Sequence, residues 1–245
     1  MGKIPFAFDA DLLQIGIKAP VFCDFQTWPM LLVVGATGSG KSYAMALLLG
    51  KIAKYDPNSH FIICDYKRSS FAFAEQSKSF YGYNATSEGI DFVYEEFSAR
   101  LEANDEKRNR DKWFLIIDEF GAFILSLEKK TAEIYKNRIA EMLFMGRSLG
   151  ISIIIGVQRA EAEYFKNGAR DQFGAIILLG NLSKEQKAML IPDYKDLVSS
   201  SNSRGQGYLY LDGLGLTHIQ VPKISSLEQL HKAILSKMSV PMPAE

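Results

Sequence analysis

The chain has 245 residues, a length typical of one α/β domain. Hydrophobic residues make up 47% of it and charged residues 23%, which excludes disordered and collagen-like chains and supplies enough apolar material for a core. Lys plus Arg and Asp plus Glu number 28 each, so a generally basic surface is excluded and any nucleic-acid contact must come from a local patch.

Apolar runs that end at a glycine or a polar residue predict the strands. Two short strands are expected at residues 4–8 and 21–25, five buried ones at 30–34, 60–64, 113–117, 151–157 and 175–179, and two shorter ones near 207–211 and 217–221. Helical composition or spacing predicts helices at 41–54, 86–108, 131–149 and 225–237.

The alternation of strands and helices predicts a mostly parallel sheet with helices on both faces, in an α/β fold. Residues 199–206 (SSSNSRGQ) are expected to form a flexible loop. Since no repeat or linker divides the chain, we expect a single domain over residues 1–245. Its N-terminal short strands occupy residues 1–29, and residues 225–245 form a C-terminal helix and tail.

Cysteine usage and hydropathy indicate the compartment. Cys23 and Cys64 are too few for a disulfide framework and lack metal-ligand spacing, and Cys64, in an apolar run, is predicted to be a buried reduced thiol. Residues 1–30 lack the pattern of a signal peptide, and no segment approaches the roughly 20 apolar residues of a spanning helix. We therefore expect a cytoplasmic protein that a partner would have to recruit to a membrane.

Residues 35–42 (GATGSGKS) match the complete P-loop pattern G-x-x-x-x-G-K-[ST] between a predicted strand and a predicted helix. Its glycines let backbone N–H groups turn inward around phosphate, and the following helix adds its positive N-terminal end. This setting disfavours a chance match by a glycine-rich turn. The predicted nucleotide-binding residues are Gly35, Ala36, Thr37, Gly38, Ser39, Gly40, Lys41, Ser42 and Tyr43. Lys41 is expected to reach the terminal phosphates of ATP, and Ser42 to hold Mg²⁺.

Two carboxylates, Asp118 and Glu119, follow the apolar strand at 113–117. In P-loop enzymes the first such carboxylate binds the metal, and the second can polarise the attacking water. We expect adjacent strand tips to place Asp118 beside Ser42, and Glu119 to act as the base. The alternative is a helix N-cap region without catalytic function.

Three more features lie at strand or helix ends. Gln158 follows the strand at 151–157 and is predicted to sense the γ-phosphate; the alternative is a polar strand cap. Arg147 is predicted to complete a neighbouring subunit's site as an arginine finger, or else to stabilise a helix C-terminus. Asp65-Tyr66-Lys67 could pair with the Asp118–Glu119 region, contact a subunit boundary or form a structural ion pair.

Taken together, the motifs resemble the FtsK/SpoIIIE branch of the FtsK–HerA superfamily of ring-forming DNA pumps, which implies a RecA-like P-loop fold. The resemblance runs from about residue 24 to 221 and is most like the coupling proteins of Gram-positive integrative and conjugative elements. Its motifs are GATGSGKS, Asp65-Tyr66-Lys67, FLIIDEF (114–120), the unit at 146–159 that contains Arg147 and Gln158, and the stretches 168–180 and 204–208. One departure is Gln158-Arg159-Ala160, where many relatives have Q-R-P.

The resemblance implies Lys41, Glu119, Gln158 and Arg147 as catalytic residues, Ser42 and Asp118 as the magnesium ligands, and a homo-hexamer with DNA in its channel. A relaxase or a membrane channel would be a further partner. Among the cations, the cluster at 107–112 fits a solvated helix end, whereas Arg159, Lys166 and Arg170 could lie near the channel.

Two other functions compete with DNA translocation. A protein-export ATPase of the type VII secretion kind shares this branch, although such chains usually carry several modules in tandem. A nucleotide-dependent switch without hydrolysis would require a defective catalytic carboxylate, and Glu119 is present.

Overall fold

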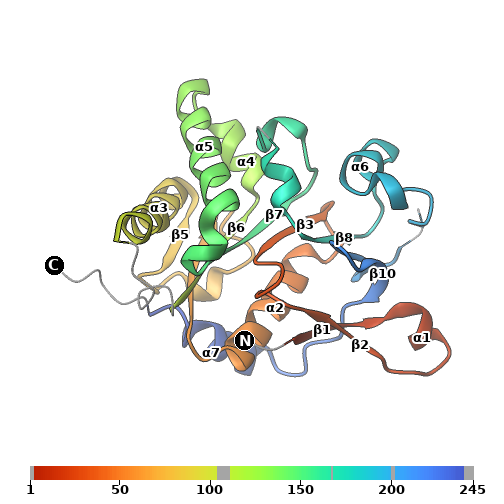
Figure 1. Cartoon of the computed structure of the whole chain (residues 1–245). Coiled ribbons are helices and arrows are strands. Elements are labelled where there is room, and N and C mark those ends of the chain that lie inside the picture. The colour runs from red at the N-terminus through yellow and green to blue at the C-terminus, as the bar shows by residue number, and fades with distance from the viewer. Residues whose placement is uncertain (1–2, 104–110, 167, 200–201, 240–245) are drawn as a thin grey trace.

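The structure is a computed structural model that describes residues 3–103, 111–166, 168–199 and 202–239. Within them the strands form one ten-stranded sheet in the order β2-β1-β10-β9-β8-β3-β7-β6-β4-β5 (Figure 1). The strands are β1 (Ile4–Asp9), β2 (Pro20–Cys23), β3 (Met30–Gly35), β4 (Ser59–Asp65), β5 (Phe80–Gly82), β6 (Lys112–Asp118), β7 (Ile151–Val157), β8 (Ala175–Leu179), β9 (Gln206–Leu211) and β10 (Gly215–Gln220).

The sheet has two parts with different pairing. All neighbours from β8 to β5 pair in parallel, whereas β9, β10, β1 and β2 continue the sheet in antiparallel pairs. The mostly parallel α/β sheet predicted from the sequence is therefore confirmed. The short strand β5 and the antiparallel direction of the extension were not predicted.

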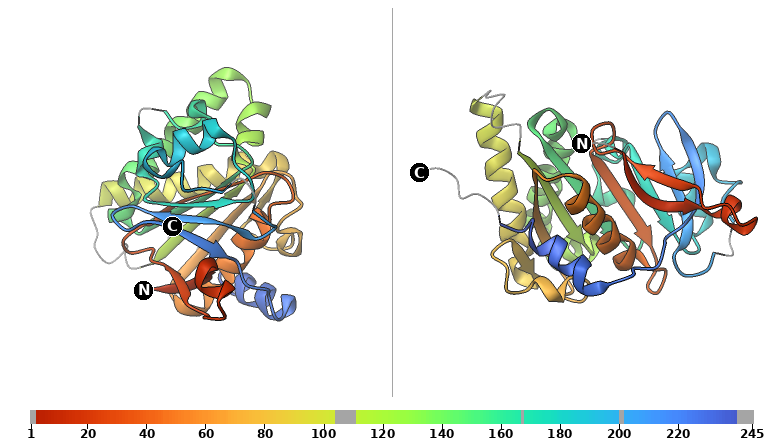
Figure 2. Two further views of the ribbon diagram at one scale, coloured as in Figure 1. Left: turned by 90° about the vertical axis from the view of Figure 1, so that its right-hand side faces the viewer. Right: turned by 90° about the horizontal axis from the view of Figure 1, so that it is seen from below.

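Helices cover both faces of the sheet, as predicted (Figures 1 and 2). The helices are α1 (Ala10–Gln14), α2 (Lys41–Tyr55), α3 (Thr86–Ala103), α4 (Phe120–Ser126), α5 (Lys129–Met145), α6 (Lys184–Leu190) and α7 (Leu227–Leu235). The predicted helix at 131–149 ends at Met145 and continues as the 3-10 turn η4 (Gly146–Leu149). The predicted basic cluster 107–112 lies outside the described residues up to position 110.

Alternating side chains of the parallel strands enter two cores. Leu32 and Val34 of β3 join the core beneath α3, α4 and α5, whereas Leu31 and Val33 face α2 and α7. This alternation follows from the two-residue period of a strand that is buried on both faces. In Figure 2 the α2–α7 layer lies in front of the sheet when the molecule is seen from below.

The strand order corrects one expectation. The tips of β3 and β6 are not adjacent, because β7 lies between them and pairs with both. The reason is that the chain visits β4 and β6 before it returns to fill the position beside β3. Contact between Asp118 and the P-loop must therefore be made across β7.

Both cysteines are buried and free, as predicted for Cys64. Burial raises the pKa of Cys23 to about 12 and also raises the pKa of Cys64. In the described ranges no helix is long and apolar enough to cross a membrane.

Candidate nucleotide site

The P-loop connects β3 to α2 at the carboxyl edge of the parallel strands. Gly40 occupies the N-cap position of α2 with φ of 97°, in the left-handed region that favours glycine. A side chain at Gly35 would lie 3.1 Å from the backbone oxygen of Leu179 on β8, so this position also requires a small residue. Beyond the loop itself, the pocket beside it is lined by Tyr43, Lys67, Ser69, Ser70, Glu119, Gln158 and Arg204.

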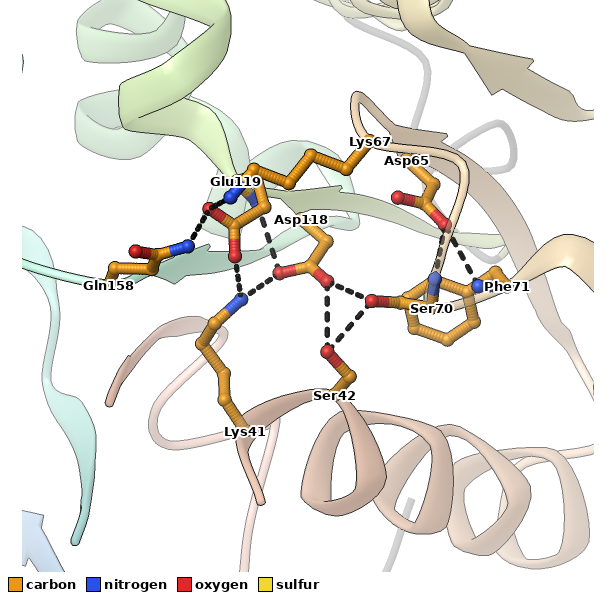
Figure 3. A network of polar contacts seen from close by, with 9 residues as sticks. All are labelled: Lys41, Ser42, Asp65, Lys67, Ser70, Phe71, Asp118, Glu119 and Gln158. Carbon is orange, nitrogen blue, oxygen red and sulfur yellow. Dashed lines mark hydrogen bonds and ion pairs between the residues drawn. The ribbon is translucent and has the colours of Figure 1, made fainter. Parts of the chain in front are cut away.

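Lys41 is only 5% exposed and forms ion pairs with both carboxylates at the end of β6 (Figure 3). Its Nζ contacts Asp118 Oδ1 and lies 3.0 Å from Glu119 Oε1. Burial alone would lower the pKa of Lys41, but the Asp118 and Glu119 carboxylates outweigh it and raise that pKa above its ordinary value. The lysine is thus held as a cation at the base of the pocket.

Asp118 is fully buried and contacts two hydroxyl groups through its other oxygen. Asp118 Oδ2 lies 3.2 Å from Ser42 Oγ and 2.6 Å from Ser70 Oγ, and the two hydroxyl oxygens are 2.7 Å apart. The carboxylate reaches α2 across β7 because position 156 on that strand is a glycine. A Cβ at Gly156 would lie 2.6 Å from Asp118 Oδ1 and 2.7 Å from Met45 Sδ.

Glu119 stands at the N-cap position of α4, yet its side chain makes no capping hydrogen bond. Its backbone has φ of 61°, a left-handed conformation that is uncommon for a residue other than glycine. The carboxylate oxygen Oε2 lies 3.0 Å from Lys67 Nζ and accepts a 3.0 Å hydrogen bond from Gln158 Nε2. The side chain therefore contacts the pocket's polar groups and does not cap the helix.

The loop after β4 brings two side chains to this cluster. Lys67 pairs with Glu119, which agrees with the first of the three alternatives for Asp65-Tyr66-Lys67. Asp65 Oδ2 accepts hydrogen bonds of 2.8 Å from the backbone N–H groups of Ser70 and Phe71. Burial raises the pKa of Asp65, and the Asp118 charge adds to this, while the backbone hydrogen bonds oppose it. Asp65 thus holds the backbone of this loop in place through these hydrogen bonds.

The antiparallel extension supports the P-loop from the other side. Gly205 donates a 2.9 Å backbone hydrogen bond to the Ser39 carbonyl, and Arg204 lines the pocket. The Tyr43 hydroxyl lies 3.2 Å from the Pro222 carbonyl oxygen and accepts a hydrogen bond from the Ile224 N–H. Tyr43, predicted to contact nucleotide, therefore also fixes the chain that follows β10.

The structure does not bring Arg147 to this pocket. Arg147 is exposed in η4 and lines a different groove with Pro29 and Lys112, at the amino ends of the parallel strands. It lies at the sheet edge opposite the P-loop. The other cations considered for a channel each face a carboxylate: Arg159 with Glu161, Lys166 with Glu133, and Arg170 with Asp171.

Sequence reasoning missed three residues of the site: Ser70, Gly156 and Arg204. Gly156 lies in a strand made mostly of β-branched residues, and a glycine inside a strand can signal close approach of another group. Ser70 has no such signal. Arg204 begins the stretch 204–208 that contributes to the family resemblance, but that stretch did not indicate a position beside the P-loop.

A sequence model described as the FtsK/SpoIIIE family matches residues 5–78, which contain the P-loop. The FtsK domain-containing protein YdcQ of Bacillus subtilis (strain 168) is 24% identical over 198 residues, which cover 75% of this chain and 41% of YdcQ. The ESX secretion system protein EccC of Thermomonospora curvata is 29% identical over 168 residues, 62% of this chain and 12% of EccC. The chain thus spans less than half the length of these curated relatives.

Solved structures share the fold. The cytoplasmic domain of the T. curvata type VII secretion ATPase EccC has a TM-score of 0.70 and 20% identity, covering 98% of this chain and 31% of that one. The pCW3 conjugation coupling protein TcpA, in a monomer form with ATPγS, has a TM-score of 0.71 and 17% identity, covering 89% and 67%. Together with the P-loop, the carboxylate pair at the end of β6 and the RecA-like sheet, these similarities support a P-loop ATPase of the FtsK type.

Proposed function

We propose that this chain is the ATP-hydrolysing subunit of a ring-shaped DNA translocase, a coupling ATPase of a conjugative element. The observation that carries the proposal is the separation of Arg147 from the P-loop of its own chain, at opposite edges of one sheet. An arginine in that position lies away from the nucleotide pocket of its own chain, so as an arginine finger it would act on a neighbour's nucleotide. The similarity to the conjugation coupling protein TcpA supports DNA as the polymer.

The residues at the end of β6 and the start of α2 fit magnesium. Ser42 Oγ and Asp118 Oδ2 lie 3.2 Å apart, and Mg²⁺ prefers such hard oxygen ligands, usually with waters and substrate phosphate completing the shell. We assign Ser42 and Asp118 as the protein ligands. Bound Mg²⁺ would neutralise charge on the β- and γ-phosphates.

Lys41 is proposed to exchange partners when ATP binds. In the structure its ammonium is shared by Asp118 and Glu119. The P-loop amides would bind phosphate beside it, and the phosphate would attract the ammonium away from the carboxylates. This exchange frees Asp118 for the metal and Glu119 for a water molecule, so that ATP itself prepares the site.

Glu119 is proposed as the general base, with Gln158 and Lys67 holding its carboxylate. Gln158 reaches Glu119 from β7 with an amide that has hydrogen-bonding capacity left for a γ-phosphate oxygen. Loss of that phosphate after hydrolysis would change the hydrogen bonds of Gln158 and thus signal the nucleotide state. Arg147 from the next subunit would stabilise charge on the transferred phosphoryl group.

The assembly proposed is a homo-hexamer in which each chain forms one RecA-like domain, with DNA in the channel. A ring explains how a chain with zero formal net charge can bind DNA, because repeated copies concentrate a few cations on one surface. A cytoplasmic location, and a relaxase or membrane channel as partner, complete the proposal.

The direct test measures the ATPase rate with and without single-stranded and double-stranded DNA at low salt. We expect DNA to stimulate turnover, and particle mass with ATP and Mg²⁺ to correspond to a ring. The absence of both stimulation and DNA binding would refute a DNA translocase. A persistent monomer would leave Arg147 with no neighbouring site.

Mixing two inactive variants tests the shared site. Arg147→Ala lacks the finger and Glu119→Gln lacks the base, but a mixed ring contains interfaces in which both residues are intact. We expect the mixture to recover part of the ATPase rate that each variant lacks alone. No recovery in a mixture shown by mass to form mixed rings would contradict action of Arg147 in trans.

Protein export of the type VII secretion kind is the second candidate, favoured by 29% identity to EccC over 62% of this chain. The same site would then drive a polypeptide. Turnover stimulated by peptide and unaffected by DNA would favour this candidate over the first.

A further inference from the structure

Ser70 is the residue at the nucleotide site whose position no sequence motif predicts. It lies in the loop between β4 and the 3-10 turn η1 (Ala72–Ala74) and is half-buried. Figure 3 shows its hydroxyl between Ser42 and Asp118, with the oxygens of all three residues facing one another. The shortest of these contacts, 2.6 Å, joins Ser70 Oγ to Asp118 Oδ2.

The loop fixes Ser70 firmly. The backbone N–H groups of Ser70 and Phe71 both donate to the buried Asp65 carboxylate, and the Phe71 side chain is fully buried. The Ser70 side chain has only one rotatable bond before its hydroxyl. With the backbone fixed, the hydroxyl therefore lies at Asp118 with little conformational freedom. The hydroxyl points toward the carboxylate even though the pocket beside it is open to solvent.

The three oxygens share two hydroxyl protons. Ser42 must present an oxygen lone pair to a metal ion, and Asp118 must present a carboxylate oxygen in a fixed orientation. A hydroxyl group that donates to that carboxylate restricts its rotation and leaves the Ser42 lone pair available. Groups that hydrogen-bond to metal ligands in this way commonly change metal affinity by about 10- to 100-fold when they are removed.

We propose that Ser70 is a positioning residue of the magnesium site, which orients Asp118 and Ser42 and raises the affinity of the nucleotide complex for a divalent cation. Lys67, from the same loop, holds the neighbouring carboxylate of Glu119. One loop thus orders both carboxylates at the end of β6. The role concerns the ATPase site itself and is independent of the polymer that the enzyme moves.

The test uses Mn²⁺ as the probe, because electron paramagnetic resonance measures free Mn²⁺ directly and needs no turnover. Mn²⁺ is titrated into wild-type protein with saturating ADP, and into Ser70→Ala, Ser70→Thr and Ser225→Ala. We expect Ser70→Ala to weaken Mn²⁺ binding about tenfold or more. Ser70→Thr keeps the hydroxyl and should stay close to wild type.

Ser225→Ala is the matched control, because Ser225 is an exposed serine in the loop before α7 and is not among the residues that line the nucleotide pocket. ADP affinity in EDTA separates a metal effect from loop damage and should be the same in all four proteins. Equal Mn²⁺ affinity in wild type and Ser70→Ala would overturn the proposal. A loss of ADP affinity in EDTA that is as large in Ser70→Ala as its loss of Mn²⁺ affinity would overturn it too. Since no DNA or peptide is present, failure of the translocase proposal leaves this result unaffected.

Discussion

The parallel and antiparallel parts of the sheet make different contributions to the nucleotide site. In the parallel part, β6 and β7 are almost entirely buried and end together at one edge, where they place Asp118 and Gln158. In the antiparallel part, β10 is mostly half-exposed, and Gly205, immediately before β9, makes a backbone hydrogen bond to the P-loop. The parallel strands therefore supply the reactive side chains, and the extension supports the loop.

Among the predicted changes, replacing the proposed base, Glu119 at the end of β6, should have the largest effect on activity. Glu119→Gln keeps the shape of the side chain but removes the charge that accepts a proton. We expect kcat to fall by about 10²- to 10⁴-fold, because general-base catalysis is typically of that size, while nucleotide still binds. Steady-state ATPase rates and equilibrium nucleotide binding measure the two quantities.

Glu128→Gln is the matched control for this change. Glu128 also occupies a helix N-cap position without a capping hydrogen bond, at the start of α5, but it is exposed. Its ATPase rate should equal that of wild type. Unchanged turnover in Glu119→Gln would show that the base is another group and would favour the nucleotide-switch interpretation.

The second prediction concerns the strand that Asp118 must cross. In Gly156→Ala the new methyl would lie 2.6 Å from Asp118 Oδ1 and 2.7 Å from Met45 Sδ, so one of them must move. We expect a loss of about 1–3 kcal/mol in the free energy of unfolding, as for other overpacked cores, together with weaker Mg²⁺-dependent nucleotide binding. Denaturant unfolding and titration with a fluorescent nucleotide check both.

Gly89→Ala separates a packing defect from a site defect. A methyl at Gly89 would lie 2.6 Å from Cys64 Sγ and from the Tyr81 ring, in the core beneath α3. It should change stability and leave nucleotide affinity unaltered. If Gly156→Ala binds nucleotide as wild type does, β7 can shift aside, and its glycine is not needed for the Asp118 contacts.

Most of the parallel part was predictable from the sequence, because β3, β4, β6 and β7 are largely apolar runs that lead directly into residues of the site, whereas the short β5 was not predicted. The P-loop and the pair Asp118–Glu119 carry local patterns, so their contact with each other could be expected. The neighbour relations of the strands could not, since β7 follows both β3 and β6 in the sequence but lies between them in the sheet. Local sequence does not encode that order.

Ser70 and Arg204 illustrate a second limit. Each reaches the pocket from an irregular loop whose path depends on contacts with residues far away in the sequence, such as Ser39 with Gly205. Neither loop has a period or a motif that fixes where its side chains point. The position of Glu119 shows the same limit, because its left-handed backbone arises from the tight turn between β6 and α4.

The smallest predicted effect tests how the extension is joined to the parallel part. The Tyr43 hydroxyl links α2 to Pro222 and Ile224, which follow β10. Tyr43→Phe leaves the Ile224 N–H without this acceptor and should reduce the free energy of unfolding by about 1 kcal/mol, a shift of roughly 2–4 °C in Tm for a chain of this size. Tyr55→Phe is the control, because Tyr55 is 43% exposed on the same helix and its hydroxyl has no hydrogen-bond partner in the described part of the chain. Equal Tm values for Tyr43→Phe and Tyr55→Phe would mean that backbone contacts such as Gly205 to Ser39 suffice to hold the extension against the P-loop.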